Sequence, residues 1–427
     1  MIRLYEKEID LKNILNREIQ SYTDIEPIVS KIIDMVIREK DKAVLAYSRK
    51  FDCPNLESLE VSREEIEAAK SRIDADFLET LRQAKENIEF FHKNQLRDGF
   101  RLKKQDGIVL GQKYTPIEKV GIYVPGGTAS YPSTVLMNAI PAKIAGVKQI
   151  IMTTPSDRSG KIKDEILVAA DLCGVDRIFK CGGAQAVAAL AYGTETIPAV
   201  DKIVGPGNIF VAVAKKMVFG KVSIDMIAGP SEILVIADET ADPVCVAADL
   251  LSQAEHDKLA SPVLITNSHE LAVRVSDELE RQIPKLLRSD IARASIDNCG
   301  KIIVAESIER AIEISNEIAP EHLEVCVDNP FDYLDSIKNA GSIFLGKNSP
   351  EPIGDYFAGP NHTLPTGGSA KFSSPLSVDD FRKKSSYLYY TKEALYNAKD
   401  RVTDFAMREG LQAHARSILA RFDKENG

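Results

Sequence analysis

The chain has 427 residues, which is too long for one ordinary domain and predicts two or three. Hydrophobic residues make up 44% of it and charged residues 27%, a balance that excludes a mainly disordered or fibrous chain. The formal net charge of −9 argues against nonspecific nucleic-acid binding, because a phosphate backbone requires a basic face.

Residues 1–100 have helical periodicity and many charges. Apolar residues at spacings of seven and four predict an amphipathic helix that includes Ile66, Ile73, Phe77 and Leu81. The start of the chain alternates charged and apolar residues without an apolar leader, and the six cysteines form no CxxC pair. These two features lead us to expect a cytoplasmic protein with reduced thiols.

From Lys119 onward, strand-like and helix-like segments alternate, which indicates βαβ units and a parallel sheet. The expected strands are 120–124, 149–153, 177–180, 202–204 and 232–237, and the expected helices are 133–145, 163–173, 184–191 and 208–218. A possible second sheet has helices at 242–255, 271–282 and 309–317 and strands at 263–266, 301–305, 323–327 and 342–345. After Pro375 the pattern predicts a small, charged helical tail.

Glycine-rich turns follow several of the expected strands. They are Pro125-Gly-Gly, Cys181-Gly-Gly-Ala-Gln185 and Gly205-Pro-Gly-Asn208, and a fourth turn, Gly229-Pro-Ser231, precedes the expected strand at 232–237. Such turns at the carboxyl edge of a parallel sheet favour a phosphate or nucleotide site, although none matches the GxGxxG fingerprint. Tight turns that require positive φ are the other explanation.

Two groups of residues carry candidate chemistry. Gln253 and His256 lie at i, i+3 on one helix face and could bind zinc, but this spacing is more typical of a solvated helix end. Glu321 and His322 follow Pro320 and could be two proton-transfer groups, whereas a surface helix start explains them at least as well. The motifs alone therefore leave both assignments open.

Longer strings carry a more specific signal. In chain order they are GIYVPGG, CGGAQAVAAL, GPGN, AGPSEILVIAD, DLLSQAEHD, APEHLEV, GDYFAGPNHTLPT and GLQAHARSI, between Gly121 and Ile418. Through these strings the chain resembles the histidinol dehydrogenase family. The resemblance implies zinc-dependent, NAD-linked oxidation of L-histidinol to L-histidine through L-histidinaldehyde, the last two steps of histidine biosynthesis.

The resemblance also implies roles for individual residues. The implied zinc ligands are Gln253, His256, Asp355 and His414, and the catalytic pair is Glu321, which activates water, and His322, the general base. The implied substrate contacts are Ser231, Gln253, His256, His322, Asp355, His362, Glu409 and His414, and the NAD contacts are Tyr123, Gln185 and Asn208. Zinc would position the substrate.

The expected fold is α/β, with two Rossmann-like parallel-sheet domains and small helical segments at both ends. We expect an N-terminal segment at 1–20, a zinc-carrying domain at 21–118 and 235–376, an NAD-binding domain at 119–234, and a helical tail at 377–427. In the family this tail reaches the active site of the partner in a homodimer, so we expect shared sites. We expect no nucleic-acid or membrane partner.

Three alternatives remain at this stage. A zinc hydrolase could use the same cluster, with Glu321 activating water, but the glycine-rich turns would then need another purpose. A noncatalytic two-lobed binding protein is the second. The third is oxidation through a cysteine thiohemiacetal, for which Cys326 is the nearest candidate, although it reads better as a small buried hydrophobic residue.

Overall fold

The structure is a computed structural model and describes residues 2–5, 24–126, 130–227 and 229–422. Most of the expected segment 1–20 lies outside these residues, as do Gly127 and Ala228 of the quoted strings. The chain divides into two units. Unit 1 comprises Met1–Gln95 and Ile117–Phe381, and unit 2 comprises Leu96–Pro116 and Arg382–Gly427.

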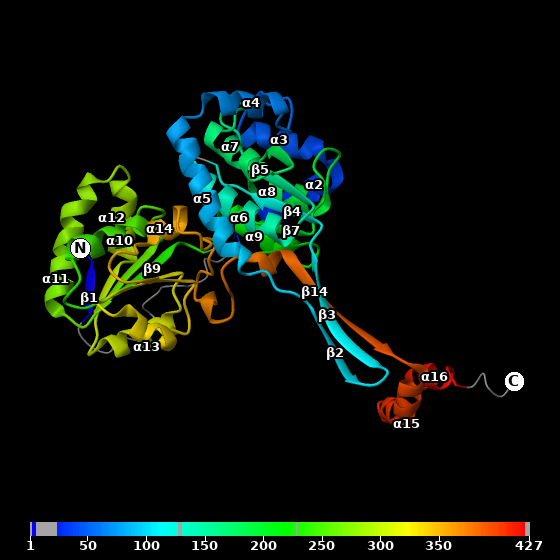
Figure 1. The fold of residues 1–427 in the computed structure, drawn as a ribbon. Coiled ribbons are helices and arrows are strands. Elements are labelled where there is room, and N and C mark those ends of the chain that lie inside the picture. Colours follow the sequence, from blue (N-terminus) through cyan, green and yellow to red (C-terminus); the bar gives the residue numbers. More distant parts are fainter. Residues whose placement is uncertain (1, 6–23, 127–129, 228, 423–427) are drawn as a thin grey trace. The chain divides into compact units, whose positions relative to one another are not determined.

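One parallel sheet of unit 1 contains four of the first five expected strands, those at 120–124, 149–153, 177–180 and 202–204 (Figure 1). The fifth, at 232–237, belongs to the second sheet. The order of the first sheet is β6-β5-β4-β7-β8, and its strands are β4 (Lys119–Tyr123), β5 (Gln149–Thr154), β6 (Arg177–Lys180), β7 (Lys202–Val204) and β8 (Ser223–Ile224). The connecting helices are α6 (Pro132–Ala145), α7 (Asp164–Leu172), α8 (Gly183–Tyr192) and α9 (Ile209–Val218). Strands β4–β7 are largely buried, as expected for parallel strands covered on both faces, whereas the edge strand β8 is partly exposed.

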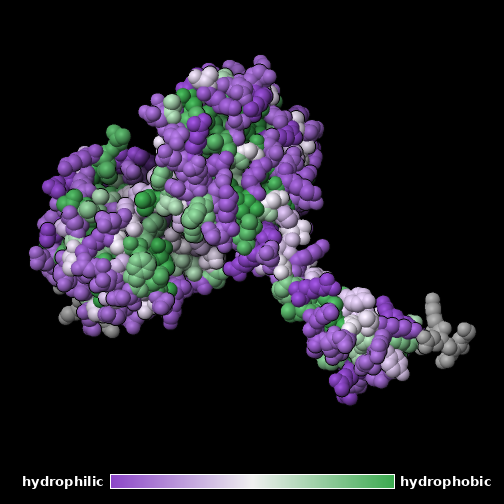
Figure 2. All heavy atoms as spheres, viewed as in Figure 1, coloured by the Kyte–Doolittle hydropathy of each residue, from purple (hydrophilic) through white to green (hydrophobic). Residues whose placement is uncertain are grey.

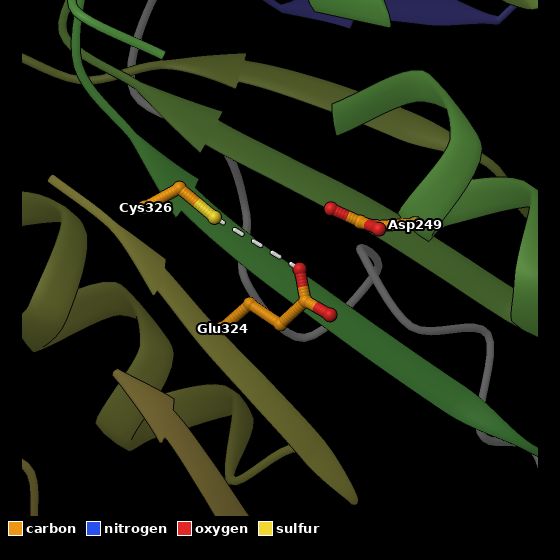
Figure 3. Close-up of side chains that lie close together, drawn as sticks. All are labelled: Asp249, Glu324 and Cys326. Atoms are coloured by element: carbon orange, nitrogen blue, oxygen red, sulfur yellow. Dashed lines mark hydrogen bonds between the residues drawn. The ribbon is translucent and has the colours of Figure 1, made fainter. Parts of the chain in front are cut away.

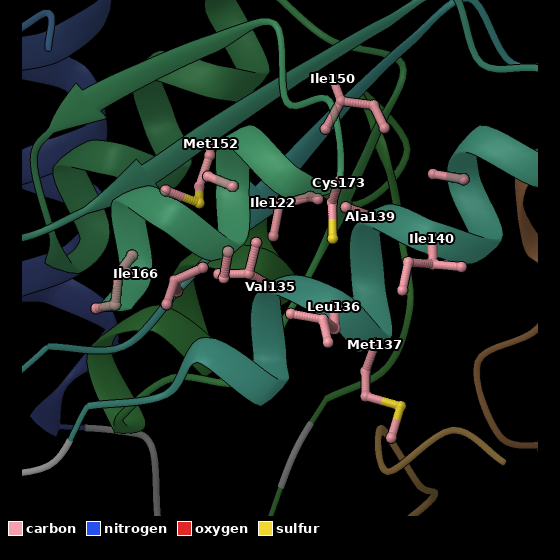
Figure 4. Packing of buried hydrophobic residues seen from close by; sticks show 14 of the residues in the cluster. Ile122, Val135, Leu136, Met137, Ala139, Ile140, Ile150, Met152, Ile166 and Cys173 are labelled. Atoms are coloured by element: carbon pink, nitrogen blue, oxygen red, sulfur yellow. The ribbon is translucent and has the colours of Figure 1, made fainter. Parts of the chain in front are cut away.

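Four N-terminal helices form outer layers on this sheet. They are α2 (Glu26–Glu39), α3 (Asp41–Phe51), α4 (Arg63–Arg72) and α5 (Ala75–Lys93). Helices α4 and α5 share a core with α6 and α7, in which Leu136 and Met152 are buried (Figure 4). Helices α2 and α3 share the other core with α8 and α9. The expected division groups residues 21–118 with the other sheet, but the apolar faces of α2–α5 pack on this one.

The second parallel sheet of unit 1 has the order β1-β11-β10-β9-β12-β13. Its strands are β1 (Arg3–Tyr5), β9 (Glu232–Ala237), β10 (Ser261–Thr266), β11 (Lys301–Val304), β12 (His322–Cys326) and β13 (Ser342–Leu345). Its helices are α10 (Pro243–Ala254), α11 (His269–Gln282), α12 (Ser289–Asn298), α13 (Ile308–Ile318) and α14 (Glu351–Tyr356), with 3-10 turns η2 (Ile283–Lys285), η3 (Pro330–Ser336), η4 (Ser369–Lys371) and η5 (Val378–Phe381).

Alternate residues of β9 serve two different cores because side chains of a strand point to opposite faces. Ile233 and Val235 pack with α10, α11 and α12, and Leu234 and Ile236 pack with α13. The two parallel sheets confirm the expected α/β fold class.

Unit 2 is a three-stranded antiparallel sheet followed by two helices. The sheet order is β14-β3-β2, with β2 (Phe100–Gln105), β3 (Ile108–Pro116) and β14 (Arg382–Tyr390), and the helices are α15 (Lys392–Arg408) and α16 (Gln412–Leu419). The expected helical tail is therefore helical only after β14. Among the described residues of the chain, no helix combines the length and apolar character needed to cross a membrane.

Candidate functional site

The candidate site begins where the amino ends of β9 and β12 lie side by side. The two strands are parallel and hydrogen-bonded, with His322 opposite Ile233. This register places Ser231 and Glu232 next to Glu321 and His322. The Glu232 backbone N–H donates to the Glu321 carboxylate at 2.9 Å. The predicted pair thus occupies a strand start, and both side chains are almost fully buried.

The orientation of the His322 ring follows from one hydrogen bond. Its Nδ1 lies 2.9 Å from the Glu232 carbonyl oxygen, which can only accept, so Nδ1 carries the proton. In the neutral ring, Nε2 then has the free lone pair. Nε2 is buried and has no hydrogen-bond partner among the described residues. It lies 3.7 Å from an Asp355 oxygen, which is too long for a hydrogen bond.

Two helices bring the remaining predicted residues of unit 1 to these strand ends. Helix α10 starts at the Asp242 cap with Pro243 in its first turn, as the sequence predicts, and its carboxyl end carries Gln253 and then His256. The Gln253 side-chain nitrogen is also buried without a partner among the described residues. Helix α14 carries Asp355, whose backbone oxygen accepts a hydrogen bond from His362 Nδ1 at 3.1 Å.

A cavity of about 300 Å³ joins these side chains. Its lining includes seven of the predicted residues, namely Ser231, Gln253, His256, Glu321, His322, Asp355 and His362. The turn at Gly205–Gly207 and the half-buried to exposed residues Tyr131 and Tyr356 complete part of the wall. The geometry therefore gathers into one pocket residues that are widely separated in the sequence.

Burial and neighbouring charges shift the pKa values of the carboxyl and imidazole groups in the pocket. Burial raises the pKa of Glu321 to about 8, although His322 lowers it. Burial lowers the pKa of His322, but Glu321 and Asp355 outweigh it and raise that pKa to about 10. The pKa of Asp355 is raised by burial and lowered further by His322 and His362, so it falls below its usual range.

The other two imidazoles of the pocket have lowered pKa values. Desolvation lowers the pKa of His362, which is half-buried, and of His256, whose side chain reaches solvent. Neutral imidazole and ionised carboxylate are the forms that bind a metal. The structure also groups His322, Asp355 and Glu351, whose ligand-type atoms all lie within 4.8 Å of one another.

A second cavity of about 760 Å³ contains the three expected cofactor contacts. Tyr123 ends β4, and its hydroxyl accepts a hydrogen bond from Gly183 N at 3.0 Å. Gln185 is buried on α8, and Asn208 caps α9 by accepting from the N–H groups of Phe210 and Val211. Pro125 lines both cavities, so the two are neighbours.

Local backbone geometry explains why glycine occupies two of the turns at the carboxyl edge of this sheet. Gly183 has φ +64°, and Gly205 has φ +109° with the Tyr123 carbonyl so close that a Cβ would clash with it. Tight turns thus account for both positions.

The remaining predicted residues, Glu409 and His414, are exposed on unit 2, at the end of α15 and in α16.

Comparisons with known proteins place the chain in a family. A family model described as histidinol dehydrogenase matches residues 15–422. The chain belongs to the histidinol dehydrogenase family. A histidinol dehydrogenase from Clostridium acetobutylicum is 59% identical over 411 residues, which cover 96% of this chain and 95% of that protein. One from Listeria monocytogenes is 54% identical over 419 residues, covering 98% and 97%.

Comparison with a solved structure also supports membership in this family. The crystal structure of histidinol dehydrogenase from Elizabethkingia anophelis has a TM-score of 0.95 at 41% identity, and the match covers 100% of this chain and 99% of that one. Membership in the histidinol dehydrogenase family makes the protein an oxidoreductase. The hydrolase and the noncatalytic binding protein considered from the sequence are therefore set aside.

Sequence reasoning missed a buried carboxylate network beside the site (Figure 3). Asp249 on α10 lies opposite Glu324 on β12, with Cys326 close by. Burial and Asp249 raise the pKa of Glu324 to about 9, so its carboxyl is protonated at neutral pH. The Glu324 Oε1 accepts from the Glu351 backbone N–H at 2.6 Å. Glu324 thus links α10, β12 and α14, the three elements that carry Gln253, His322 and Asp355.

Cys326 belongs to this network as a buried thiol. Burial raises its pKa above the usual range, with Glu324 adding to the effect. Its Sγ lies 3.9 Å from a Glu324 oxygen. A thiol held in its protonated form is a poor nucleophile. This environment agrees with the interpretation of Cys326 as a small buried residue.

The network predicts that two substitutions of Glu324 change the free energy of unfolding by different amounts. Glu324→Gln should leave the free energy of unfolding within about 1 kcal/mol, because a Gln amide replaces the protonated carboxyl and retains both a donor and an acceptor. Glu324→Ala should cost about 2–5 kcal/mol, since it leaves a cavity and unpaired buried groups. Chemical denaturation of both variants measures this. Equal destabilisation by the two substitutions would contradict the network.

Proposed function

We propose that the protein oxidises L-histidinol to L-histidine through L-histidinaldehyde, the last two steps of histidine biosynthesis, with NAD and one zinc ion per subunit. The single observation that carries this proposal is the cavity in which Glu321, His322, Asp355 and His362 meet, with the lone pair of His322 Nε2 directed into a buried, unpaired position. Family membership supplies the substrate class.

The residues of the cavity fit a zinc ion. Gln253 offers its side-chain amide oxygen, His256 an imidazole nitrogen and Asp355 a carboxylate oxygen, and all three residues line the cavity. We assign these three as ligands, with His414 as the fourth. When bound, zinc would hold the substrate nitrogens in place and, as a positive charge beside Asp355, lower the pKa of His322.

His322 is assigned as the general base for the alcohol. Its Nδ1–H donates a hydrogen bond to the Glu232 carbonyl oxygen. Rotation of the ring, or a change to the other tautomer, would break this hydrogen bond. The proton of the substrate hydroxyl therefore goes to Nε2 as the carbon loses hydride. NAD supplies the hydride acceptor in each of the two oxidations. Ser231 and His362 line the same cavity and are assigned to hold the substrate.

Glu321 is assigned to the second oxidation, which needs water to add to the aldehyde. Its carboxyl is buried, and one oxygen is oriented by the Glu232 N–H. A base whose pKa is raised toward neutrality by burial is well matched to take a proton from water. The same residue, Glu232, thus orients both members of the catalytic pair.

The expected NAD contacts Tyr123, Gln185 and Asn208 line the neighbouring cavity, whose volume of about 760 Å³ falls in the range of cofactor sites. Two helices, α8 and α9, begin there, and helix N-termini favour phosphate groups. The shared residue Pro125 connects this cavity to the proposed substrate cavity. We therefore assign it to NAD, with the nicotinamide end toward Pro125.

We further propose a homodimer in which Glu409 and His414 complete the partner's site and contact its substrate. Both residues are exposed, and unit 2 carries exposed apolar side chains, among them Leu388, Tyr389 and Phe405, of a kind that monomers rarely leave uncovered in number. Figure 2 shows green and white atoms on the visible face of this unit.

Biosynthetic function is consistent with the expected cytoplasmic location.

The zinc assignment predicts a loss of metal in Asp355→Ala. Removal of the charged ligand should reduce bound zinc at least about tenfold after dialysis at limiting free metal. Asp257→Ala is the matched control, because Asp257 is next to His256 but uses its carboxylate within its own loop, where it accepts from Leu259 N. Elemental analysis gives the zinc content. Full zinc in Asp355→Ala would show that the ligand set is wrong.

The two half-reactions distinguish the roles of the catalytic pair. Glu321→Gln should slow oxidation of histidinaldehyde by about 10²–10⁴-fold and oxidation of histidinol much less, because an amide cannot accept the proton of water. His322→Asn should slow both. Each substrate is supplied separately and NADH formation is followed. Equal losses in both half-reactions for Glu321→Gln would refute its assignment to the second step.

Shared sites predict that two inactive variants complement each other. His322→Asn and His414→Asn are unfolded, mixed and refolded together. Random pairing gives about half mixed dimers, each with one doubly damaged and one intact site, so roughly a quarter of all sites should recover. Mass spectrometry confirms the mixed dimers. If each site were built within one chain, every site would keep a lesion and no activity would return.

A further inference from the structure

The N-terminal helices form part of the wall of the proposed NAD cavity. Ile28 and Ile32 from α2, and Phe51 and Asp52 from the end of α3, line it together with the carboxyl edge of the sheet. The substrate cavity has none of these residues in its lining, and the two cavities share Pro125. The α2–α3 wall therefore lines the NAD cavity and not the substrate cavity.

Asp52 is the unusual residue of this wall. It caps the carboxyl end of α3, where its backbone N–H donates to the Ser48 oxygen. Its carboxylate atom Oδ2 is buried and has no hydrogen-bond partner among the described residues. Burial raises the pKa of Asp52 to about 6, although Arg158 lowers it. An ionised carboxylate in this position therefore reduces the stability of the fold, as functional groups often do.

The second carboxylate of the cavity is already engaged. Asp157 Oδ1 accepts from the backbone N–H groups of Ser159 and Lys161 and from the Ser159 hydroxyl, so it closes its own turn. Among the described residues that line the cavity, Asp52 and Asp157 are the acidic ones. Asp52 is thus the carboxylate available to a ligand.

The remaining charges of the cavity match the other parts of a dinucleotide. Arg158, Lys161 and Lys163 lie in the loop after β5 and supply positive charge for a diphosphate, as do the N-termini of α8 and α9. With the nicotinamide at Pro125, the adenosine end falls toward α2 and α3. A carboxylate is the acceptor that binds the two hydroxyls of an unmodified ribose.

We propose that Asp52 accepts hydrogen bonds from the hydroxyls of the adenosine ribose and thereby makes the cavity select NAD over NADP. The 2′-phosphate of NADP would replace a hydrogen-bond donor by a negative charge next to the carboxylate. This inference rests on the proposed use of NAD and adds the residue that sets the cofactor preference. It places that residue on an N-terminal helix outside the βαβ units.

Direct binding tests this selection without turnover. NAD and NADP are titrated separately into metal-stripped protein in a calorimeter, and thermal melting is recorded for each variant. The wild type should bind NAD at least tenfold more tightly than NADP, since loss of a charged hydrogen-bond partner costs about that much or more. Asp52→Asn should weaken NAD binding about tenfold and bring the ratio of the two affinities close to one.

Matched variants separate this effect from folding and from general charge. Asp34→Asn removes the same charge from an exposed position of α2 that does not line the cavity, and it should leave both affinities unchanged. Asp52→Asn should melt no lower than the wild type, because it removes a desolvated charge whose buried Oδ2 has no hydrogen-bond partner among the described residues. Asp52→Ser, which keeps a small acceptor without charge, should lose the preference as well.

The binding results distinguish the role of Asp52 from the assignment of the cavity to NAD. A wild type that binds NAD tightly, together with Asp52 variants that keep the same preference over NADP, overturns this inference and leaves the proposed function standing. A wild type that binds neither dinucleotide overturns the assignment of the cavity to NAD and this inference with it.

Discussion

The site depends on the parallel register of β9 and β12. Because His322 stands opposite Ile233, the backbone of Glu232 meets both members of the predicted pair. Its N–H binds Glu321, and its carbonyl binds His322 Nδ1. A shift of one residue would turn His322 to the other face of the sheet and break both bonds. Sheet pairing, and not a flexible loop, therefore sets the orientation of the catalytic groups.

The two sheets contribute opposite edges to the chemistry. The substrate cavity lies at the amino ends of β9 and β12, whereas Tyr123 marks the carboxyl end of β4. The turn at Gly205 belongs to the wall of the substrate cavity and is fixed by a buried ion pair. Lys215 contacts both Asp225 and the Gly205 oxygen, and Asp225 accepts from Gly205 N at 2.8 Å. Buried charges thus hold the wall in place.

The sequence predicted most of the elements of unit 1, because continuous apolar runs and amphipathic helices leave a clear periodicity. It missed the sheet of unit 2. Strand β2, with the sequence FRLKKQ, is exposed along its whole length and has no buried face to create a pattern. It also misgrouped α2–α5, since an amphipathic helix shows that it has an apolar face but not which sheet that face covers.

The candidate site was predictable to the extent that its residues lie in diagnostic strings. Glu321 and His322 are recognisable in APEHLEV, but Asp249, Glu324 and Glu351 look like ordinary solvated charges in the sequence. Only the fold shows that Glu324 and Glu351 are buried, that Glu324 meets Asp249, and that the Glu351 backbone N–H donates to Glu324. The unpaired oxygen of Asp52 is a three-dimensional property as well, with no sequence signal that we recognise.

The central claim is that one pocket carries an alcohol through two successive oxidations. Its most direct test is the stoichiometry of a complete reaction with limiting histidinol, excess NAD and added zinc, with NADH measured by absorbance and products by mass spectrometry. The account predicts two NADH for each histidinol consumed, histidine as the product, and no accumulated aldehyde. One NADH for each histidinol, with histidinaldehyde released as the end product, would contradict it.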